Sequence, residues 1–430
     1  MHKYTPISND LYKANRDRFS KQLPNKSVAI FHSNDQFPRN GDLYHPWRQN
    51  SDMYYLSGID QEKSILVLFP NAPLPQYREA LFILESNEQI AIWEGHKYTK
   101  EEAQVASGIE NIFFIEDFNA ALEKIMLLAE KIYLNLNEND RAVNDVPYKD
   151  IRFAKDLKER FPLHEYGRAN PILAKLRTIK SELEIETIQS ACNITEKAFR
   201  RVLGFIKPNV FEYEIEAEII HEFIINRSNG HAYEPIVASG ANACCLHYGE
   251  NNDICKDGEM ILMDFGADYA NYASDLTRTI PVNGIFSERQ KEVYNANLKV
   301  MKEASSMLRP GITLDDFNKE VGKVMESALI DIKLLDATDV KNQNPSNPLY
   351  RKYFMHGTSH FMGLDVHDIG NRYEPIEEGM VFTCEPGIYI REEGLGIRLE
   401  NDLCIGANEN TDLMASIPIE IEEIESLMNK

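Results

Sequence analysis

Acidic residues inside apolar strand segments are the feature that most constrains how this chain can fold. Asp264 lies within the apolar segment 260–268, and Asp275 lies in the segment 272–281, which follows a short turn at 269–271. These segments are expected to form a hairpin in which both carboxylates can project to the same side. A lone buried aspartate is usually a satisfied structural group, but two facing carboxylates repel each other unless a cation lies between them. The pattern therefore favours a metal site.

A second pair of acids repeats this arrangement. The segments 380–391 and 396–404 are also expected to form a hairpin, with Glu385 near the end of one strand and Glu400 on the return strand. We expect a two-halved sheet whose hairpins face a common centre. Two divalent ions would balance the four negative charges of the carboxylates, with a bridging hydroxide left over. Such oxygen-rich ligand sets suit Mn²⁺, Mg²⁺ or Co²⁺ better than a closed cysteine–zinc site does.

Histidines in segments interrupted by glycines complete the candidate site. His356 and His360 have the spacing HxxxH, which binds zinc on a helix, but Gly357 and Gly363 argue against a helix here. For any one histidine an ordinary core or surface role is the better interpretation, and only the clustering beside the acids changes that balance. The other candidates are His247, His367, Tyr389 and Arg398.

The pattern of short apolar runs and helical stretches in the first part of the chain is typical of an α/β domain. With 430 residues, the chain exceeds what one hydrophobic core usually organises, so two domains are expected. Short apolar runs at 28–31 and 64–69 predict buried strands that alternate with helical stretches. The runs 80–84 and 89–93 resemble the two strands of a hairpin.

Longer helices and strand pairs are expected in the second part. A charged helical stretch over 173–184 continues as an amphipathic helix to Leu203, and Gly204 and Pro208 end it. Further helices are expected over 211–228, 287–308 and 315–331. Because helices and strands come in blocks, an α+β layer arrangement is favoured, with helices covering one face of a sheet. The predicted domains are 1–172 and 173–430.

Composition excludes several classes of function. The net charge of -22 argues against a nucleic-acid partner, because phosphate binding needs clustered Lys and Arg. No apolar run suggests a signal peptide or a membrane span, so a cytoplasmic location is expected. The six cysteines follow no CxxC spacing. Cys384 precedes Glu385, but a buried residue that points away from the site is a better interpretation than a thiolate ligand.

Together, the segments around the acids and His360 resemble the peptidase family of aminopeptidase P, prolidase, creatinase and methionine aminopeptidase, whose catalytic domain has the pita-bread fold. The resemblance covers about the last 250 residues, and its motifs are specific in order and local context. It implies that Asp264 binds one metal ion and that His360 and Glu385 bind the other. Asp275 and Glu400 would then bridge the two ions.

The resemblance also implies roles for the surrounding side chains. His247, His356 and His367 would position the substrate and move protons, which suits groups that titrate near neutrality. Glu385 would act as general base and then as acid toward the leaving proline nitrogen, and His356 would stabilise the oxyanion. The candidates for the walls of a proline pocket are His356, His367, Tyr389 and Arg398.

Two N-terminal segments add to the resemblance. Residues 48–58, with the sequence RQNSDMYYLSG, are similar to the N-terminal domain that aminopeptidase P and prolidase carry and methionine aminopeptidase lacks. Residues 92–95 resemble an aminopeptidase P segment that lends an aromatic side chain, here Trp93, to the pocket of a neighbouring subunit. The family also implies a homodimer or homotetramer.

The expected activity is removal of the N-terminal residue from peptides with proline in second position, by metal-activated hydroxide attack with two ions, Mn²⁺ or else Co²⁺ or Zn²⁺. The short connection 391–395 favours aminopeptidase P over the alternative, Xaa-Pro dipeptidase, which often carries an insertion there. Retention of all five ligands argues against creatinase and against a non-catalytic binding module. Many relatives have Asp directly after the last ligand, where this chain has Asn401-Asp402, and the difference concerns the surroundings of the ligands.

Overall fold

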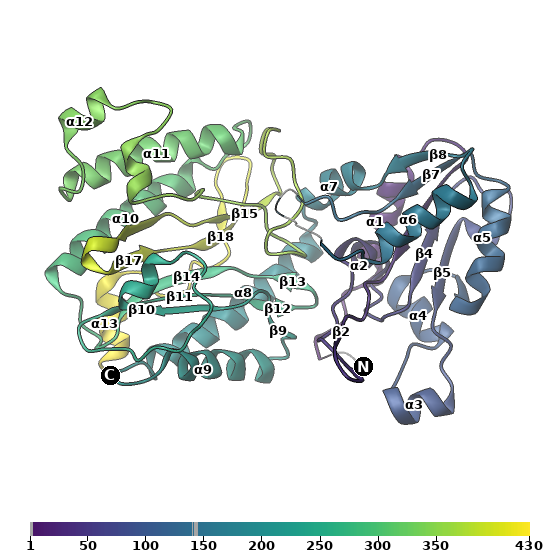
Figure 1. Ribbon diagram of the computed structural model, residues 1–430, viewed down its shortest axis with the longest axis horizontal. Coiled ribbons are helices and arrows are strands. Elements are labelled where there is room, and N and C mark those ends of the chain that lie inside the picture. Colours follow the sequence, from purple (N-terminus) through teal and green to yellow (C-terminus); the bar gives the residue numbers. More distant parts are fainter. Residues whose placement is uncertain (1–2, 140, 142–144) are drawn as a thin grey trace. The chain divides into compact units, whose positions relative to one another are not determined.

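The computed structural model describes residues 3–139, 141 and 145–430 (Figure 1). The chain folds as two compact units, Met1–Arg177 and Thr178–Lys430. The first contains a mixed six-stranded sheet in the order β6-β5-β4-β1-β7-β8. The strands of the first unit are β1 (Ser27–His32), β2 (Pro38–Asn40), β3 (Leu43–Tyr44), β4 (Ile65–Leu68), β5 (Glu79–Ile83), β6 (Asn111–Phe114), β7 (Lys131–Leu134) and β8 (Glu165–Arg168). Its helices are α1 (Asn9–Ser20), α2 (Ser51–Ser57), α3 (Glu88–Glu94), α4 (Lys100–Ser107), α5 (Phe118–Met126), α6 (Lys149–Arg160) and α7 (Asn170–Thr178).

The centre of this sheet is buried as its apolar sequence predicts. All six residues of β1 and all four residues of β4 are buried, and the two strands pair antiparallel. Helix α5 packs Leu122 and Ile125 into the same hydrophobic core. On α1, the ring of Phe19 meets that of Phe31 on β1 edge to face, at 5.4 Å between centroids. The predicted α/β character of the first part is confirmed.

The predicted hairpin over 80–84 and 89–93 is wrong in its second half. Residues 79–83 form β5, but Glu88–Glu94 form the helix α3. Strand β5 already has a neighbour at each edge, β4 and β6, so no edge is left for a third strand. Asn87 caps the helix, because its side chain accepts a hydrogen bond from the Ile90 amide. None of the residues of α3 is buried, so the apolar residues of this helix do not recur on a face that packs against a core.

The second unit is built from two interrupted hairpins, each covered by helices. Its strands are β9 (Gly230–His231), β10 (Ile236–Ser239), β11 (Met260–Phe265), β12 (Ala267–Tyr269), β13 (Tyr272–Ala273), β14 (Leu276–Pro281), β15 (Val381–Cys384), β16 (Gly387–Ile390), β17 (Leu395–Arg398), β18 (Asn401–Cys404) and β19 (Thr411–Asp412). Its helices are α8 (Glu182–Leu203), α9 (Glu212–Ile225), α10 (Glu288–Met307), α11 (Leu314–Asp331), α12 (Ala337–Asn342) and α13 (Ile421–Met428). Helix α8 contacts β12 and β13 of the first hairpin, α9 contacts the adjoining strands β9 and β10, and α10 contacts strands of the second hairpin. The predicted α+β arrangement is confirmed.

The long helix predicted from 173 to 203 is interrupted. Helix α7 ends at Thr178 and α8 begins at Glu182. Between them, Ile179 pairs with Met380 in a single β-bridge, and Ser181 forms a capping box with Glu184 at the start of α8. The Ser-x-x-Glu signature over residues 181–184 marks this start in the sequence.

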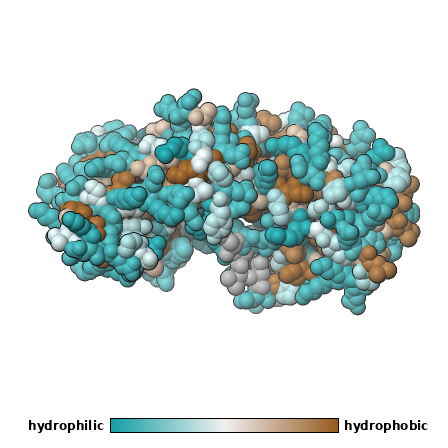
Figure 2. Space-filling model, turned by 90° about the horizontal axis from the view of Figure 1, so that it is seen from above, coloured by the Kyte–Doolittle hydropathy of each residue, from teal (hydrophilic) through white to brown (hydrophobic). Residues whose placement is uncertain are grey.

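Hydrophilic side chains cover most of the face shown in Figure 2. Among the described residues, none of the helices combines the length and the apolar character that crossing a membrane requires.

Candidate metal centre

The first hairpin presents Asp264 and Asp275 as the sequence predicts. Strands β11 and β14 pair antiparallel with Asp264 opposite Thr277, and Asp275 lies directly before β14. The turn is formed by Ala270 and Asn271, both in the left-handed region with φ of 52° and 65°. The expected turn at 269–271 is confirmed, and the two carboxylates belong to facing strands.

The second hairpin presents the two glutamates at breaks in its strands. Glu385 lies between β15 and β16, and Glu400 lies between β17 and β18. Strand β16 turns into β17 through a short 3₁₀ turn that ends at Gly394, whose φ of 60° suits glycine. The predicted hairpin and its short connection are confirmed.

Thr277 and Arg278 join the two hairpins at the centre. Glu400 donates its amide to the carbonyl of Thr277 at 3.1 Å, and the Thr277 hydroxyl donates to Glu400 Oε2 at 2.6 Å. The fully buried guanidinium of Arg278 donates to the carbonyl of Glu400 and to the side chain of Asn401, each at 2.7 Å. These contacts hold the acids of one half against those of the other.

His360 reaches the acids from a segment that runs beside β15. Its backbone exchanges hydrogen bonds with Thr383, and Phe361 forms a bridge with Phe382. The ring Nδ1 donates to the Phe361 carbonyl at 3.0 Å, so Nε2 carries the lone pair and is the nitrogen able to coordinate a metal ion. His360 Nε2 lies 3.4 Å from Asp275 Oδ2 and 3.7 Å from a Glu385 oxygen.

Burial makes these acids hard to ionise, which is the condition that a metal ion relieves. Burial and the neighbouring acids raise the pKa of Asp275 and of Glu400 well above the ordinary range. Burial likewise raises the pKa of Glu385 to about 7. Arg398, which donates to Asp264 Oδ2 at 2.5 Å, is a cation within this group of acids.

The donor atoms fit a divalent cation. One ligand atom from each of Asp275, His360 and Glu400 lies within 4.8 Å of the others, and all three residues are buried. Carboxylate oxygens and a neutral imidazole nitrogen are ligands that Mn²⁺, Co²⁺ and Zn²⁺ accept. Glu385 lies beside this group because it is close to His360, and Asp264 lies beside it because it contacts the Tyr233 hydroxyl. All five predicted ligands therefore lie in one cluster.

His356, Tyr389 and Arg398 form a hydrogen-bonded chain at the edge of the cluster. His356 Nε2 lies 2.8 Å from the Tyr389 hydroxyl, to which Arg398 Nη1 donates at 3.0 Å. His356 Nδ1 lies 3.7 Å from Glu385. Burial, the Arg398 charge and His247 lower the pKa of His356 to about 3, so the ring is neutral at neutral pH.

The two remaining histidines occupy different surroundings. The ring of His367 meets the His360 ring edge to face, at 4.5 Å between centroids. His247 is exposed, but it lies close enough to His356 to influence the pKa of that ring. Trp93 belongs to the first unit, on α3, and is 83% exposed. Cys384 is buried with its sulfur toward Ser305 and Met301 of α10, away from the acids.

Tyr233 is a member of the cluster that the sequence did not reveal. Its hydroxyl lies 2.6 Å from Asp264 Oδ1 and 2.5 Å from Asp275 Oδ1, so it bridges the two acids of the first hairpin. Asp402 is a second such residue, because its Oδ2 accepts the amide of Asp275 at 2.9 Å. No periodic pattern around Tyr233 marks it in the sequence as a site residue. Asp402 stands out there only as an acid close to the last predicted ligand, Glu400.

Comparisons with known proteins agree with this fold and site. Residues 186–407 match the Metallopeptidase family M24, and residues 12–133 match the Aminopeptidase P, N-terminal domain. A Xaa-Pro aminopeptidase of Haemophilus influenzae is 35% identical over 425 residues, which cover 96% of this chain and 95% of that protein. The structure of aminopeptidase PepP from Pseudomonas aeruginosa matches with a TM-score of 0.90 at 30% identity, over 99% of this chain and 98% of that one. Zinc-substituted Escherichia coli aminopeptidase P with product matches with a TM-score of 0.87 at 31% identity, over 99% of both chains.

The fold and the cluster of acids around His360 define a metal-dependent hydrolase with a pita-bread catalytic domain. The chain belongs to metallopeptidase family M24 and carries the N-terminal domain of aminopeptidase P. The family resemblance and the fold class expected from the sequence are both confirmed.

Proposed function

We propose that the protein is a Xaa-Pro aminopeptidase, which releases the N-terminal residue from peptides that have proline in second position. One observation carries the proposal: acids from two hairpins converge on His360 in a chain that matches Xaa-Pro aminopeptidases along nearly its whole length. The short turn between β16 and β17 favours this activity over that of a Xaa-Pro dipeptidase.

Two divalent ions, with Mn²⁺ preferred and Co²⁺ or Zn²⁺ also suited, would be held by Asp264, Asp275, His360, Glu385 and Glu400. When bound, the divalent ions would lower the pKa of water and polarise the scissile carbonyl. Glu385 accepts a proton from the attacking water and delivers it to the leaving proline nitrogen. Its position 3.7 Å from both His356 and His360 supports a role at the reacting bond.

The residues around Glu385 supply the other functions. His356 stabilises the oxyanion, and its hydrogen bond with Tyr389 fixes the orientation of the ring. His247 and His367 position the substrate and move protons. Proline at the leaving side presents a ring instead of an N–H group, and we assign the walls of its pocket to His356, His367, Tyr389 and Arg398. The chain that links three of these side chains supports a rigid wall.

The decisive experiment compares three substrates of the protein loaded with Mn²⁺. Ala-Pro-Ala should release alanine, Ala-Ala-Ala should be resistant, and the dipeptide Ala-Pro should be a poor substrate. A preference for Ala-Pro would identify a dipeptidase instead. No turnover of any peptide, together with no bound divalent ion after supplementation, would favour a binding module.

Substitution of the proposed base tests the mechanism separately. Glu385→Ala should lower kcat for Ala-Pro-Ala by at least about 100-fold, the usual contribution of a general base. Glu392→Ala is the matched control, because Glu392 is an acid of the nearby turn whose partner is Lys352. Near-full turnover by Glu385→Ala with added Mn²⁺ would refute the role of this glutamate.

We also propose a homodimer or homotetramer in which Trp93 completes the substrate pocket of a neighbouring copy. The exposure of Ile92 and Trp93, at 72% and 83%, supports this role, because large apolar side chains seldom stay exposed together without a partner. Mixing Trp93→Ala with Glu385→Ala should restore activity, since only mixed oligomers combine an intact Trp93 with an intact Glu385. Sedimentation of a monomer, or no recovery after subunit exchange, would contradict the proposal.

A further inference from the structure

The second unit contains a buried ion pair that lies outside the set of proposed metal ligands. Lys180 Nζ donates to Asp368 Oδ2 at 3.3 Å, and each side chain is only 1% exposed. Taking two charges out of water is costly, so a buried ion pair is often no more stabilising than apolar side chains of similar volume. Stability alone is therefore a weak reason for this pair, and its surroundings indicate a further role.

The main chain of Lys180 is anchored next to the second hairpin. Lys180 lies in the connection between α7 and α8, where its amide donates to the Gly379 carbonyl at 2.9 Å. The preceding residue, Ile179, forms the β-bridge with Met380. Both contacts lie directly before β15, so the ammonium group projects from a fixed backbone.

Asp368 closes the loop that follows His360. The amide of Asp368 donates to the Phe361 carbonyl at 2.9 Å, and its Oδ1 accepts the amide of Ile369 at 3.0 Å. The chain thus leaves Phe361 and returns to it seven residues later. His367 comes directly before this closure, and its ring meets that of His360 edge to face, at 4.5 Å between centroids. The position of Asp368 therefore helps to fix the position of His367.

The middle of the same loop packs on the ion pair. A Cβ at Gly363 would lie 2.3 Å from Asp368 Oδ2 and 2.9 Å from Lys180 Cε, so a larger residue here would displace the pair. The Gly363 carbonyl accepts the amide of Ala273 at 2.8 Å, and Ala273 is the last residue of β13, two residues before Asp275. The ion pair thus supports a loop that is docked on the first hairpin, close to a proposed ligand.

His360 is held by contacts that do not involve the ion pair. Its backbone exchanges hydrogen bonds with Thr383 of β15, and its Nδ1 donates to the Phe361 carbonyl. These contacts lie at the start of the loop, beside a strand. Loss of the ion pair is therefore expected to move His367 and to leave His360 in place.

We propose that Lys180 is a positioning residue, which through its ion pair with Asp368 holds the loop so that the His367 ring stays against the His360 ring. This inference rests on the proposed function, in which His367 positions the substrate. Lys180 acts through Asp368 and is not itself a ligand. Lys180→Met tests the role, because methionine keeps an unbranched side chain but leaves Asp368 buried without this cation.

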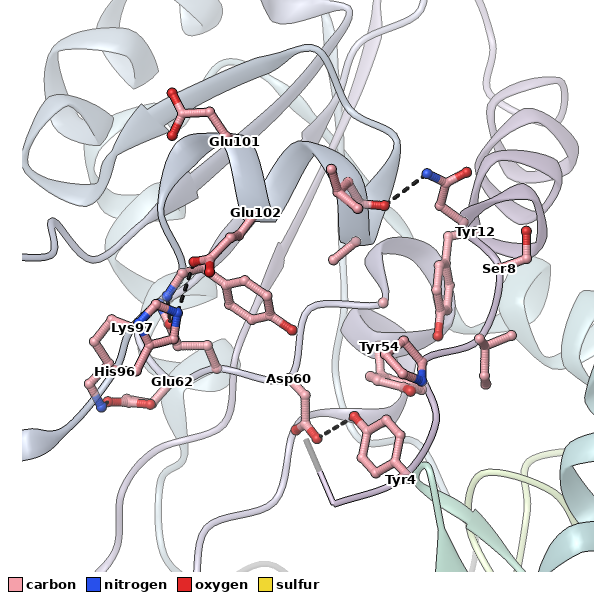
Figure 3. Close-up of a pocket in the computed structure, with 18 residues that line it drawn as sticks. Tyr4, Ser8, Tyr12, Tyr54, Asp60, Glu62, His96, Lys97, Glu101 and Glu102 are labelled. Atoms are coloured by element: carbon pink, nitrogen blue, oxygen red, sulfur yellow. Dashed lines mark hydrogen bonds and ion pairs between the residues drawn. The ribbon is translucent and has the colours of Figure 1, made fainter. Parts of the chain in front are cut away.

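Histidine-ring NMR of the Zn²⁺-loaded protein tests the position of His367 without any substrate. The nuclear Overhauser contact between the rings of His360 and His367 should be present in the wild type and lost in Lys180→Met. A change in charge alone would not remove this contact. Lys97→Met is the matched control and should keep it, because Lys97 pairs with Glu62 in the wall of a cavity of about 780 Å³ in the first unit (Figure 3). Retention of the ring contact in Lys180→Met would overturn the proposal.

A double-mutant cycle tests the consequence for catalysis. At full metal occupancy, Lys180→Met should lower kcat/KM for Ala-Pro-Ala by about 10–100-fold, because a displacement of about 1 Å in a positioning group has effects of this size. In the His367→Ala background the same substitution should lower it by less than about twofold, since both changes act through one ring. Equal losses in the two backgrounds would show a general structural effect and would overturn the proposal.

A second variant keeps the test decisive if Lys180→Met does not fold. Asp368→Asn removes the other charge, retains an acceptor for the Ile369 amide and should behave as Lys180→Met does in both experiments. Thermal unfolding shows that each variant is folded at the temperature of measurement. A wild type that cleaves no Xaa-Pro peptide would refute the proposed function, and the contact between the two rings would then decide the role of Lys180 by itself.

Discussion

Thr277 and Glu400 are joined twice, by a main-chain hydrogen bond of 3.1 Å and by a hydroxyl–carboxylate hydrogen bond of 2.6 Å. The pair connects the first hairpin to the second at the level of the acids. Thr277→Val keeps the shape of the side chain but leaves Glu400 without this donor. We expect metal affinity to fall by about 10–100-fold, as is typical when a ligand loses its supporting hydrogen bond. Equilibrium dialysis with Mn²⁺ measures the change.

Two variants control for a simple loss of packing. Thr277→Ser keeps the hydroxyl and should bind metal almost as the wild type does. Thr279→Val removes a buried hydroxyl two residues further along β14, where the hydroxyl donates to the Arg398 carbonyl at 3.1 Å. It should lose stability without losing metal affinity. An equal loss of affinity in Thr279→Val and Thr277→Val would refute the specific role of Thr277.

Tyr233→Phe should impair the centre although Tyr233 is not a ligand. Burial and the nearby Asp264 raise the pKa of Tyr233 well above its ordinary value, so the phenol remains neutral and its single proton is shared between the two acids. Without it, we expect kcat at saturating Mn²⁺ to fall by about tenfold or more. Tyr248→Phe is the control, because its hydroxyl donates to Glu212 at 2.8 Å, away from the cluster. Steady-state kinetics that do not separate the two variants would contradict this prediction.

Chelation should lower the thermal stability of the second unit. Removing ions leaves several buried carboxylates facing one another, whereas ligand at about 100 times its Kd stabilises by about 2.7 kcal/mol. For a unit of this size the shift in Tm is about 5–10 °C. Scanning calorimetry before and after Mn²⁺ is returned measures it. Asp253→Asn, outside the cluster, should keep the shift and Asp264→Asn should lose most of it; a chelated protein that unfolds at the same temperature as the loaded one would argue against a bound ion.

His231 should make the protein less stable in mild acid. Burial lowers the pKa of His231 from 6.5 to about 4, and its ring lies 5.0 Å from that of Phe223, with no partner for either nitrogen among the described residues. The unfolded chain therefore binds this proton more tightly, and the contribution to stability, present above pH 6.5, is lost as the pH falls toward 4. It amounts to about 3 kcal/mol.

The measurement is denaturant unfolding between pH 4 and 7. His231→Phe should have a flatter dependence of the free energy of unfolding on pH than the wild type. His221→Gln, an exposed histidine of α9, should leave the dependence unchanged. Parallel curves for the wild type and His231→Phe would show that the buried ring does not control this range.

The sequence was most informative where burial conflicts with charge. Asp264 and Glu400 were recognisable because an acid among apolar strand residues needs a partner, and the hairpin pattern indicated where that partner lies. Tyr233 carries no such conflict, since a buried tyrosine is ordinary and its hydroxyl reaches Asp264 only through the tertiary fold.

The two errors in the predicted fold also arise from tertiary contacts that the local sequence does not show. The run Gln89–Trp93 has residues that favour a strand, but β4 and β6 occupy both edges of β5, and only the tertiary structure reveals this. The break between α7 and α8 depends on the bridge between Ile179 and Met380, two residues that are distant in sequence. Local propensity cannot report such contacts.

The link between Thr277 and Glu400 spans 123 positions of the chain. During synthesis the first two acids leave the ribosome well before the last one, so the proposed ligands are all present only once Glu400 has been made. Chains that terminate early keep unbalanced carboxylates and lack the residues for hydrolysis.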